Sequence, residues 1–170
     1  MKVVITGSAS CGKTCLLKEL SERGFKIVGD NARAVLEERK SYAPVRGEVR
    51  YRQTEIIRRQ VLKEEEIEDL EEPVFLEYGL IDTLVYTKHL INETIEIDHD
   101  LLKGYDFIFI LERLPFIQDG VRVEKNDKEA IEVQNKIFDA YVKVGYKPII
   151  VPVLSVKERA DFVLEKVGIH

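Results

Sequence analysis

Short apolar runs alternate with amphipathic stretches along the whole chain. Runs rich in β-branched and aromatic residues lie at 2–6, 25–28, 73–77, 106–111 and 148–151, and each has the length of a buried strand. Between them, apolar residues recur at helical spacing and predict helices at 14–23, 31–39, 48–72, 81–90, 93–102, 128–144 and 156–167. Asn31 and Ser155 are the expected caps of two of these helices.

Strands that alternate with helices predict a parallel sheet with right-handed crossovers. The chain has 170 residues and shows no internal repeat, low-complexity tract or linker. This length suits one domain with a sizeable core. We therefore expect a single three-layer α/β domain over 1–170.

The segment 48–72 is highly charged, and only a few apolar residues, among them Ile56, Ile57, Val61 and Leu62, recur in it at helical spacing. The pattern predicts a long, mostly solvated helix that projects from the body. Its acidic end, 64–72, is expected to face water, as charge runs usually do.

The first strand runs directly into a phosphate-loop motif. The eight residues are Gly7, Ser8, Ala9, Ser10, Cys11, Gly12, Lys13 and Thr14, and they fit the pattern G-x-x-x-x-G-K-[ST] without a departure. Glycines allow the sharp turn, the backbone N–H groups form an anion cradle, and the following helix adds positive potential. Lys13 is expected at the β- and γ-phosphates of ATP or GTP, and the Thr14 hydroxyl at Mg²⁺.

A kinase needs a carboxylate beside Mg²⁺ and an acidic group that orients the acceptor hydroxyl. Glu77 ends the third strand and is the expected Mg²⁺-side acid, with Glu112, at the end of the fourth strand, as its rival. Asp30 follows the second strand, at the edge of the sheet where ligands bind in such folds. The alternative interpretation of Glu77 and Glu112 is a surface acid at a strand end, and that of Asp30 is a charge at a helix N-terminus.

A kinase also needs cations over the transferring phosphoryl group and a lid that excludes water. The segment 112–127 contains Pro115, Gly120 and two arginines, and is the candidate lid. Arg113 is expected at the nucleotide and Arg122 at the transferring group. A solvated surface loop is the alternative.

Composition and charge limit the possible binding partners and the cellular location of the protein. The net charge is -5, which argues against a nucleic-acid or anionic membrane partner, and no apolar stretch reaches membrane-spanning or signal-peptide length. Cys11 and Cys15 lack the further ligands that zinc requires and indicate a reduced cytoplasm. Abundant Lys, Arg and Glu, with scarce Met, Trp, Asn and Gln, indicate a thermophilic source.

Two other nucleotide-binding classes fit less well. A switch GTPase carries N-K-x-D, whereas 125–128 has these residue types in another order. A motor ATPase needs a further arginine-bearing module, for which the chain has little room. A compact kinase is favoured, while plain NTP hydrolysis and nucleotide sensing stay open.

Several motifs together resemble a compact AAA-type ATPase/kinase-like P-loop family that includes a ribosylnicotinamide kinase domain. They are the loop 7–14, Asp30 with Ala32 and Arg33, Gly79 with Asp82 and Tyr86, the run 119–124, Gly145 with Tyr146, 151–153, and Glu158 with Arg159. The resemblance implies a nucleoside-kinase-like fold with a five-stranded parallel sheet, ATP or GTP binding, and Mg²⁺. It also implies that Asp82 and Tyr86 lie near the acceptor and that Arg122 belongs to the lid.

One pair departs from the pattern of this family. Asp-Arg commonly follows the third strand there, and Glu77-Tyr78 stands here. The acid is retained, but tyrosine cannot bind a phosphate or an acceptor bidentately as arginine does. The sequence predicts a Mg²⁺-dependent phosphotransferase with a small, nucleoside-like acceptor, and it leaves the acceptor and a homo-oligomeric state open.

Overall fold

Five parallel strands form one sheet in the order β2-β3-β1-β4-β5. They are β1 (Lys2–Thr6), β2 (Lys26–Val28), β3 (Val74–Glu77), β4 (Phe107–Leu111) and β5 (Ile149–Val151). The computed structural model describes residues 1–38, 48–67, 71–117 and 123–169. Because β1 lies between β3 and β4, the turns that leave these three strands meet at one edge of the sheet. The predicted five-stranded α/β fold is confirmed.

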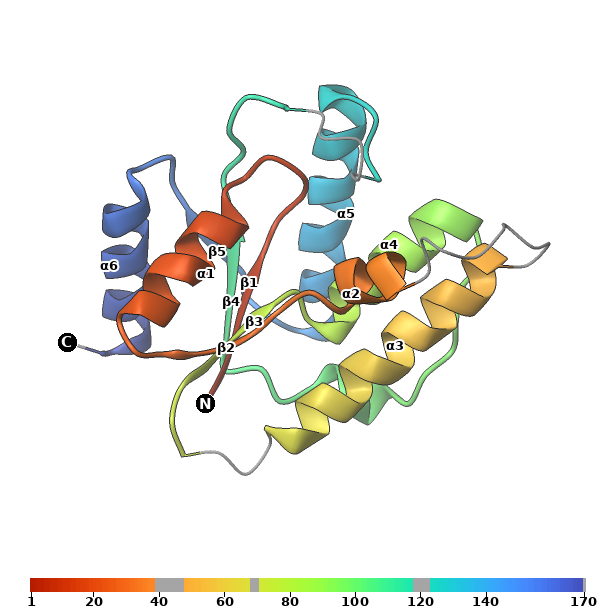
Figure 1. The fold of residues 1–170 in the computed structure, drawn as a ribbon, viewed down its shortest axis with the longest axis horizontal. Coiled ribbons are helices and arrows are strands. Elements are labelled where there is room, and N and C mark those ends of the chain that lie inside the picture. The colour runs from red at the N-terminus through yellow and green to blue at the C-terminus, as the bar shows by residue number, and fades with distance from the viewer. Residues whose placement is uncertain (39–47, 68–70, 118–122, 170) are drawn as a thin grey trace.

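Helices cover both faces of this sheet (Figure 1). The helices α1 (Lys13–Glu22) and α6 (Val156–Val167) pack together on one face, whereas α4 (Leu80–Ile91) and α5 (Asp127–Val144) cover the other. The helices α2 (Asn31–Glu38) and α3 (Glu48–Glu66) lie beyond α4. A short 3-10 helix, η1 (His99–Leu102), precedes β4.

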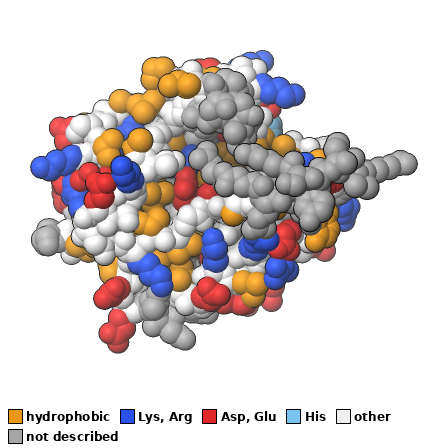
Figure 2. Space-filling view, in the orientation of Figure 1, with side chains coloured by type: hydrophobic (Ala, Val, Ile, Leu, Met, Phe, Trp, Pro, Cys, Tyr) orange, Lys and Arg blue, Asp and Glu red, His pale blue; other side chains and the backbone are white. Residues whose placement is uncertain are grey.

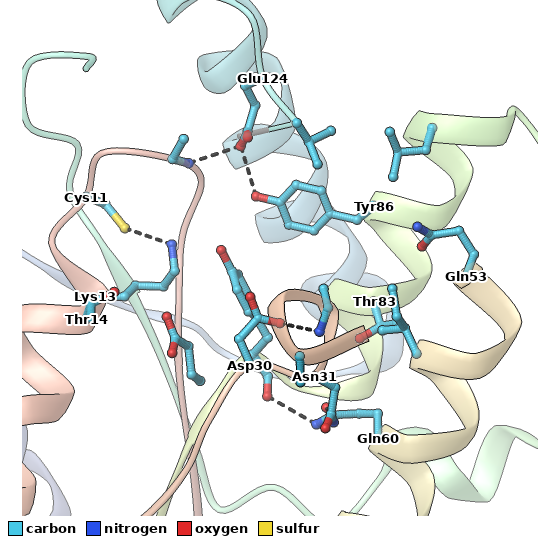
Figure 3. Close-up of a pocket in the computed structure, with 18 of the residues that line it drawn as sticks. Cys11, Lys13, Thr14, Asp30, Asn31, Gln53, Gln60, Thr83, Tyr86 and Glu124 are labelled. Carbon is cyan, nitrogen blue, oxygen red and sulfur yellow. Dashed lines mark hydrogen bonds between the residues drawn. The ribbon is translucent and has the colours of Figure 1, made fainter. Parts of the chain in front are cut away.

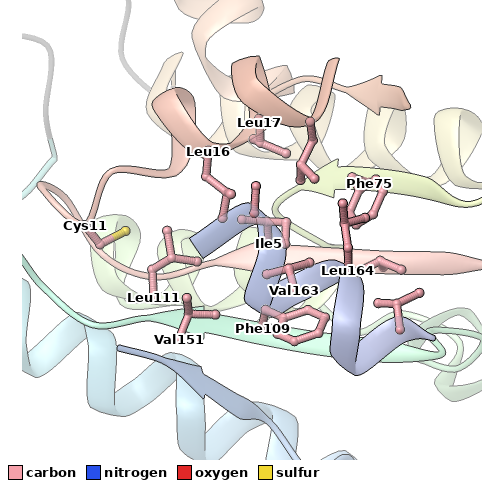
Figure 4. Packing of buried hydrophobic residues seen from close by; sticks show 14 residues of the cluster. Ile5, Cys11, Leu16, Leu17, Phe75, Phe109, Leu111, Val151, Val163 and Leu164 are labelled. Atoms are coloured by element: carbon pink, nitrogen blue, oxygen red, sulfur yellow. The ribbon is translucent and has the colours of Figure 1, made fainter. Parts of the chain in front are cut away.

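The strands are apolar throughout because both of their faces are buried. Side chains alternate across the sheet, so Ile5 and Phe109 pack against α1 and α6 (Figure 4), while Val4, Ile108 and Ile110 pack on the opposite face. All five are at most 2% exposed. The uninterrupted apolar runs of the sequence follow from this double burial.

The structure corrects three expectations about the helices. Residues 93–102 form only η1 at their end, rather than a full helix. The helix α3 ends at Glu66 and packs against α2 and α4 instead of projecting. In its acidic end, Glu64 is only 7% exposed, whereas Glu65, Glu66, Glu71 and Glu72 are exposed as expected. At the start of α2, Asp30 Oδ1 accepts from Ala32 N–H at 2.7 Å, whereas the Asn31 side chain donates to Gln60 instead of capping.

Two isoleucines on α5 provide a matched test of this packing. Ile137 is fully buried against the sheet, whereas Ile131 is 45% exposed on the outer face. We expect Ile137→Ala to lower the free energy of unfolding by about 2–5 kcal/mol, because it leaves a cavity. Ile131→Ala should change it by about 0.5 kcal/mol or less. Urea denaturation measures both, and equal losses would contradict the assigned orientation of α5.

Candidate active site

The phosphate-loop residues connect β1 to α1 in a turn that needs glycine at two places. Gly7 has φ +136° and Gly12 has φ +86°, conformations that a residue with a Cβ adopts only with strain. A Cβ on Gly7 would also lie 2.9 Å from Cys11 Sγ. The helix α1 begins at Lys13, so its first N–H groups, which have no partner within the helix, are available to an anion.

Lys13 is buried inside this turn. Its Nζ donates to the carbonyl oxygens of Gly7 at 2.7 Å and Ser8 at 3.0 Å, and lies 4.7 Å from the centre of the Tyr78 ring. Burial by itself lowers the pKa of Lys13, but the acidic groups around it, first Cys11 and then Tyr86 and Glu77, raise it above its ordinary value. The lysine is therefore a cation at neutral pH, as a phosphate ligand must be.

A cavity of about 780 Å³ opens beside the loop (Figure 3). The loop from Ala9 to Thr14 and Cys15 form one wall, the segments after β2 and β3 a second, and α3 and α4 a third. The lining residues outside the loop include Asp30, Asn31, Ala32, Ala34, Val49, Arg52, Gln53, Ile56, Gln60, Glu77, Tyr78, Thr83, Tyr86, Leu90, Val123 and Glu124. The volume is that of a small-molecule site.

The predicted acids fall at different places around the loop. Asp30 and Glu77 both line the cavity, together with Thr14. Asp30 thus fits both interpretations given above: it is an acid that faces the cavity, and it also bonds to the N-terminus of α2. Glu112 lies outside the cavity lining, and its Oε2 accepts from Val153 N–H at 3.1 Å.

Arg113 lies against the phosphate loop. Its Nη1 donates to Ser8 Oγ at 2.7 Å and to the Ala9 carbonyl at 2.8 Å, and its Nη2 pairs with Asp127. Leu114 N–H donates to the carbonyl of Ser10 at 2.9 Å. The segment after β4 therefore covers part of the loop. Arg122 lies outside the described residues, as does the side chain of Arg33, and the lid at 112–127 stays a prediction.

Of the two residues expected near an acceptor, Tyr86 lines the cavity and Asp82 does not. Asp82 is fully buried beneath it and accepts hydrogen bonds from Thr6, from the Tyr141 hydroxyl at 2.5 Å and from Gly79 N–H at 2.8 Å. Burial raises the pKa of this carboxyl despite these bonds. Asp82 therefore has a structural role, because it connects the start of α4 to β1.

Two side chains hold the loop in roles that the sequence did not predict, although Glu124 belongs to the family-like run 119–124. Glu124 is 2% exposed, and its Oε1 accepts from Ala9 N–H at 3.0 Å and from the Tyr86 hydroxyl at 2.9 Å. Gln134 accepts from Ser8 N–H at 2.7 Å and donates to the Leu111 carbonyl at 2.8 Å. The available signal for Gln134 was its place on the apolar face of the predicted helix 128–144.

Arg159 supports the loop from behind. It is 3% exposed, and its guanidinium donates to the carbonyl oxygens of Cys11 at 2.6 Å, Pro152 at 3.0 Å and Glu112 at 3.2 Å. A fixed fork of donors suits three carbonyl oxygens that converge from different segments. Burial lowers the pKa of Arg159. Arg159, together with Glu158, is part of the family resemblance seen in the sequence, but this role was not predicted.

The described residues contain no group of three or more His, Cys, Asp or Glu side chains that would by itself hold a metal ion. The oxygens of Thr14 and Glu77, which face the same cavity, suit Mg²⁺, since this ion takes few protein ligands beside phosphate oxygens. The donor set therefore fits Mg²⁺ bound together with a nucleotide.

A family model described as an AAA domain matches residues 2–159. The chain belongs to this AAA-domain family. Among curated proteins there is no matching relative.

Solved structures share the fold of this AAA-domain protein. Deoxyadenosine kinase from M. mycoides with bound dATP matches with a TM-score of 0.62 and 16% identity, over 99% of this chain and 100% of that one. A NadR protein in complex with NR matches with a TM-score of 0.70 and 18% identity, over 99% of this chain and 51% of that one. Shikimate kinase from Acinetobacter baumannii matches with a TM-score of 0.58 and 14% identity, over 98% and 92%. The AAA-domain chain thus has the P-loop kinase fold and spans about half of the NadR chain.

The surface of this AAA-domain protein mixes both charges. Figure 2 shows Lys and Arg interspersed with Asp and Glu over the face seen in Figure 1. None of the helices in the described residues is both long enough and apolar enough to cross a membrane.

Arg159→Met tests the support behind the loop. The change leaves three carbonyl oxygens without this donor, at a cost of about 1–3 kcal/mol for each group left buried and unsatisfied. We expect the dissociation constant for ATP or GTP to rise at least about tenfold, since a distorted loop loses amide contacts. Lys157→Met, on the exposed face of the same helix, is the control. Calorimetric titration measures both, and unchanged affinity in Arg159→Met would contradict the role.

Proposed function

We propose that the protein is a Mg²⁺-dependent phosphotransferase that moves the γ-phosphoryl group of ATP or GTP to a small, nucleoside-like acceptor. The observation that carries the proposal is the shared cavity. The phosphate loop with Lys13 forms one of its walls, and Asp30, Glu77 and the helices α3 and α4 form the others. A volume of about 780 Å³ leaves room for a second small molecule beside the phosphates.

The donor half of the cavity is built for phosphates. The N–H groups at the start of α1 face it, and Lys13 can exchange its bonds to Gly7 and Ser8 for phosphate oxygens. The guanidinium of Arg113 lies outside the cavity lining, where it bonds to Ser8 and the Ala9 carbonyl and pairs with Asp127, so it holds the loop in place. The N–H groups of α1 and the Lys13 ammonium stabilise the negative charge that phosphoryl transfer shifts between oxygens.

Thr14 and Glu77 are the residues that would hold Mg²⁺. When bound, the ion neutralises charge on the phosphates and orients them. Thr14 is exposed and Glu77 half-buried, so both side chains can reach a ligand in the cavity. Glu112 is less suited, because it lies outside the cavity lining.

Asp30 is the proposed group that orients the acceptor hydroxyl and takes its proton. It stands after β2, on the cavity wall that includes Glu77 and Tyr78. The rest of the acceptor half has aromatic, amide and charged side chains. Tyr78 and Tyr86 lie edge to face with ring centres 5.8 Å apart, and Gln53, Gln60 and Arg52, which is 3.9 Å from Glu48, also line the cavity. The two aromatic rings suit a ring-containing acceptor. A role for Arg122, the cytoplasmic location, the thermophilic source and a homo-oligomeric state stay predictions.

Transfer of label decides between a kinase and a hydrolase. The protein is incubated with γ-labelled ATP or GTP, Mg²⁺ and a panel of nucleosides, nucleotides and vitamins. The proposal requires label on one of the organic acceptors. Label found only in inorganic phosphate would indicate an NTPase. A nucleotide that binds but is not turned over would favour a nucleotide sensor.

Lys13→Met should lower turnover at least about 100-fold, because one preorganised cation at the phosphates is lost. Lys18→Met, at an exposed position of the same helix, is the matched control and should leave turnover unchanged. The measurement is the initial rate of label transfer under saturating nucleotide. Full turnover and affinity in Lys13→Met would refute the phosphate-loop assignment.

Glu77→Gln should lower Mg²⁺-dependent turnover about 100-fold and raise the Mg²⁺ concentration needed for half of the remaining rate, since a charged ligand is lost. Glu112→Gln should keep the rate within about twofold, as expected for a surface position. Titration of the rate with Mg²⁺ compares the two variants. The opposite ranking would move the role to Glu112.

A further inference from the structure

A row of buried polar side chains connects the interior of α3 to the cavity. Glu64, Gln60 and Asn31 are 7%, 2% and 2% exposed. Gln60 Nε2 donates to Glu64 Oε1 at 2.7 Å, and Asn31 Nδ2 donates to Gln60 Oε1 at 2.6 Å. Asn31 and Gln60 line the cavity on the side away from Glu124 and Tyr86 (Figure 3).

The direction of this row is fixed by groups that have only one hydrogen-bonding role. Gln60 Nε2 also donates to the Tyr78 carbonyl at 3.3 Å, and a carbonyl can only accept. Glu64 Oε1 receives Leu80 N–H at 3.1 Å and the Tyr105 hydroxyl at 2.8 Å. The Gln60 amide therefore turns its nitrogen to these acceptors and its oxygen to Asn31.

Asn31 must then donate to Gln60 through Nδ2, which leaves its carbonyl oxygen Oδ1 as the amide atom for a ligand. The other cavity amide, Gln53, is not oriented in this way. Its Oε1 lies 2.9 Å from Thr87 Oγ1, which is also 2.7 Å from the Thr83 carbonyl. One hydroxyl proton cannot serve both acceptors, so Gln53 can present either end of its amide.

We propose that Asn31 is a specificity-determining residue of the acceptor half, which the row through Gln60 to Glu64 sets to accept a hydrogen bond from the acceptor molecule. This inference rests on the proposed function. Asn31 follows Asp30 directly, so the group that it selects lies close to the reacting hydroxyl. It selects an O–H or N–H donor, either a sugar hydroxyl or an exocyclic amino group, and disfavours a carbonyl at the same point.

Two variants separate the effect of the orientation of the Asn31 amide from the effect of the charge on Glu64. Gln60→Met removes the acceptor for Asn31 Nδ2 and frees the Asn31 amide to turn over. Glu64→Gln removes a charge but keeps the row, because Gln60 Nε2 and the Tyr105 hydroxyl both need an oxygen as acceptor at the position of Oε1. Circular dichroism and thermal melting establish that both variants fold.

The first measurement needs no ligand. In ¹H–¹⁵N spectra of the free protein, an Asn31 Nδ2 proton should be shifted downfield, exchange slowly and show contacts to the Gln60 side chain. These features should vanish in Gln60→Met and persist in Glu64→Gln. Free rotation of the Asn31 amide in the unaltered protein would overturn the proposal.

The second measurement is the binding of matched nucleosides, with a non-hydrolysable ATP or GTP analogue present. Cytidine with uridine and adenosine with inosine compare an amino group with a carbonyl, and cytidine with its 2′-deoxy and 3′-deoxy forms tests the sugar hydroxyls. Loss of the hydrogen-bond donor should weaken binding about tenfold in one of the two comparisons, that of the base amino group or that of the sugar hydroxyls. In Gln60→Met this ratio should fall to about twofold or less, whereas Glu64→Gln should keep it.

The outcomes distinguish this inference from the proposed function. Nucleosides that bind and accept label with equal selectivity in all three proteins overturn the inference alone. If no nucleoside binds, the nucleoside-like acceptor and this inference fall together, while label transfer to another compound would still support a kinase.

Discussion

The tight turn of the phosphate loop is the constraint on which the rest of the site depends. Its backbone leaves the first N–H groups of α1 without a partner in the helix and holds a buried lysine, while two glycines adopt left-handed conformations. A turn of this kind has few bonds of its own, so side chains from distant segments supply them. Arg159 binds its carbonyl side, and Gln134 and Glu124 bind the N–H groups of Ser8 and Ala9. The loop is thus the meeting point of α6, α5 and the segment before α5.

The strand order divides the surroundings of this loop into two unlike halves. On the β4 and β5 side, the chain closes over the loop through Arg159 and Glu112, whose polar groups are used in contacts between protein segments. On the β3 and β2 side, the cavity opens, and Glu77 and Asp30 face it. Glu77 and Glu112 have the same sequence signature, because each follows an apolar run, and yet their surroundings differ. The position of β1 between β3 and β4 accounts for the difference.

Local sequence patterns predict the elements of this protein better than its long-range contacts. The strands, the phosphate loop and the helix 156–167 follow from periodicity and capping, and the cavity positions of Asp30 and Glu77 follow from the parallel sheet. The expected helix at 93–102 was wrong, because apolar spacing alone does not secure a helix when tertiary packing takes another path. Gln134 and Arg159 lie more than 100 residues from the loop atoms they bind. A polar residue on an inward helix face signals such a bond without naming its partner.

The charged segment 48–66 shows how a surface pattern can conceal a site. Arg50, Arg58, Glu65 and Glu66 are exposed, but Gln53, Gln60 and Glu64 lie on the side that packs against α2 and α4. Burial raises the pKa of Glu64, and the bonds from Gln60, Tyr105 and Leu80 oppose that rise, so the cost of burial is offset by hydrogen bonds. A fully bonded buried network has a single favoured arrangement. The same bonds that hold α3 against the turn after β3 therefore also orient an amide at the cavity, so that packing of the fold and the proposed selection of an acceptor share their residues.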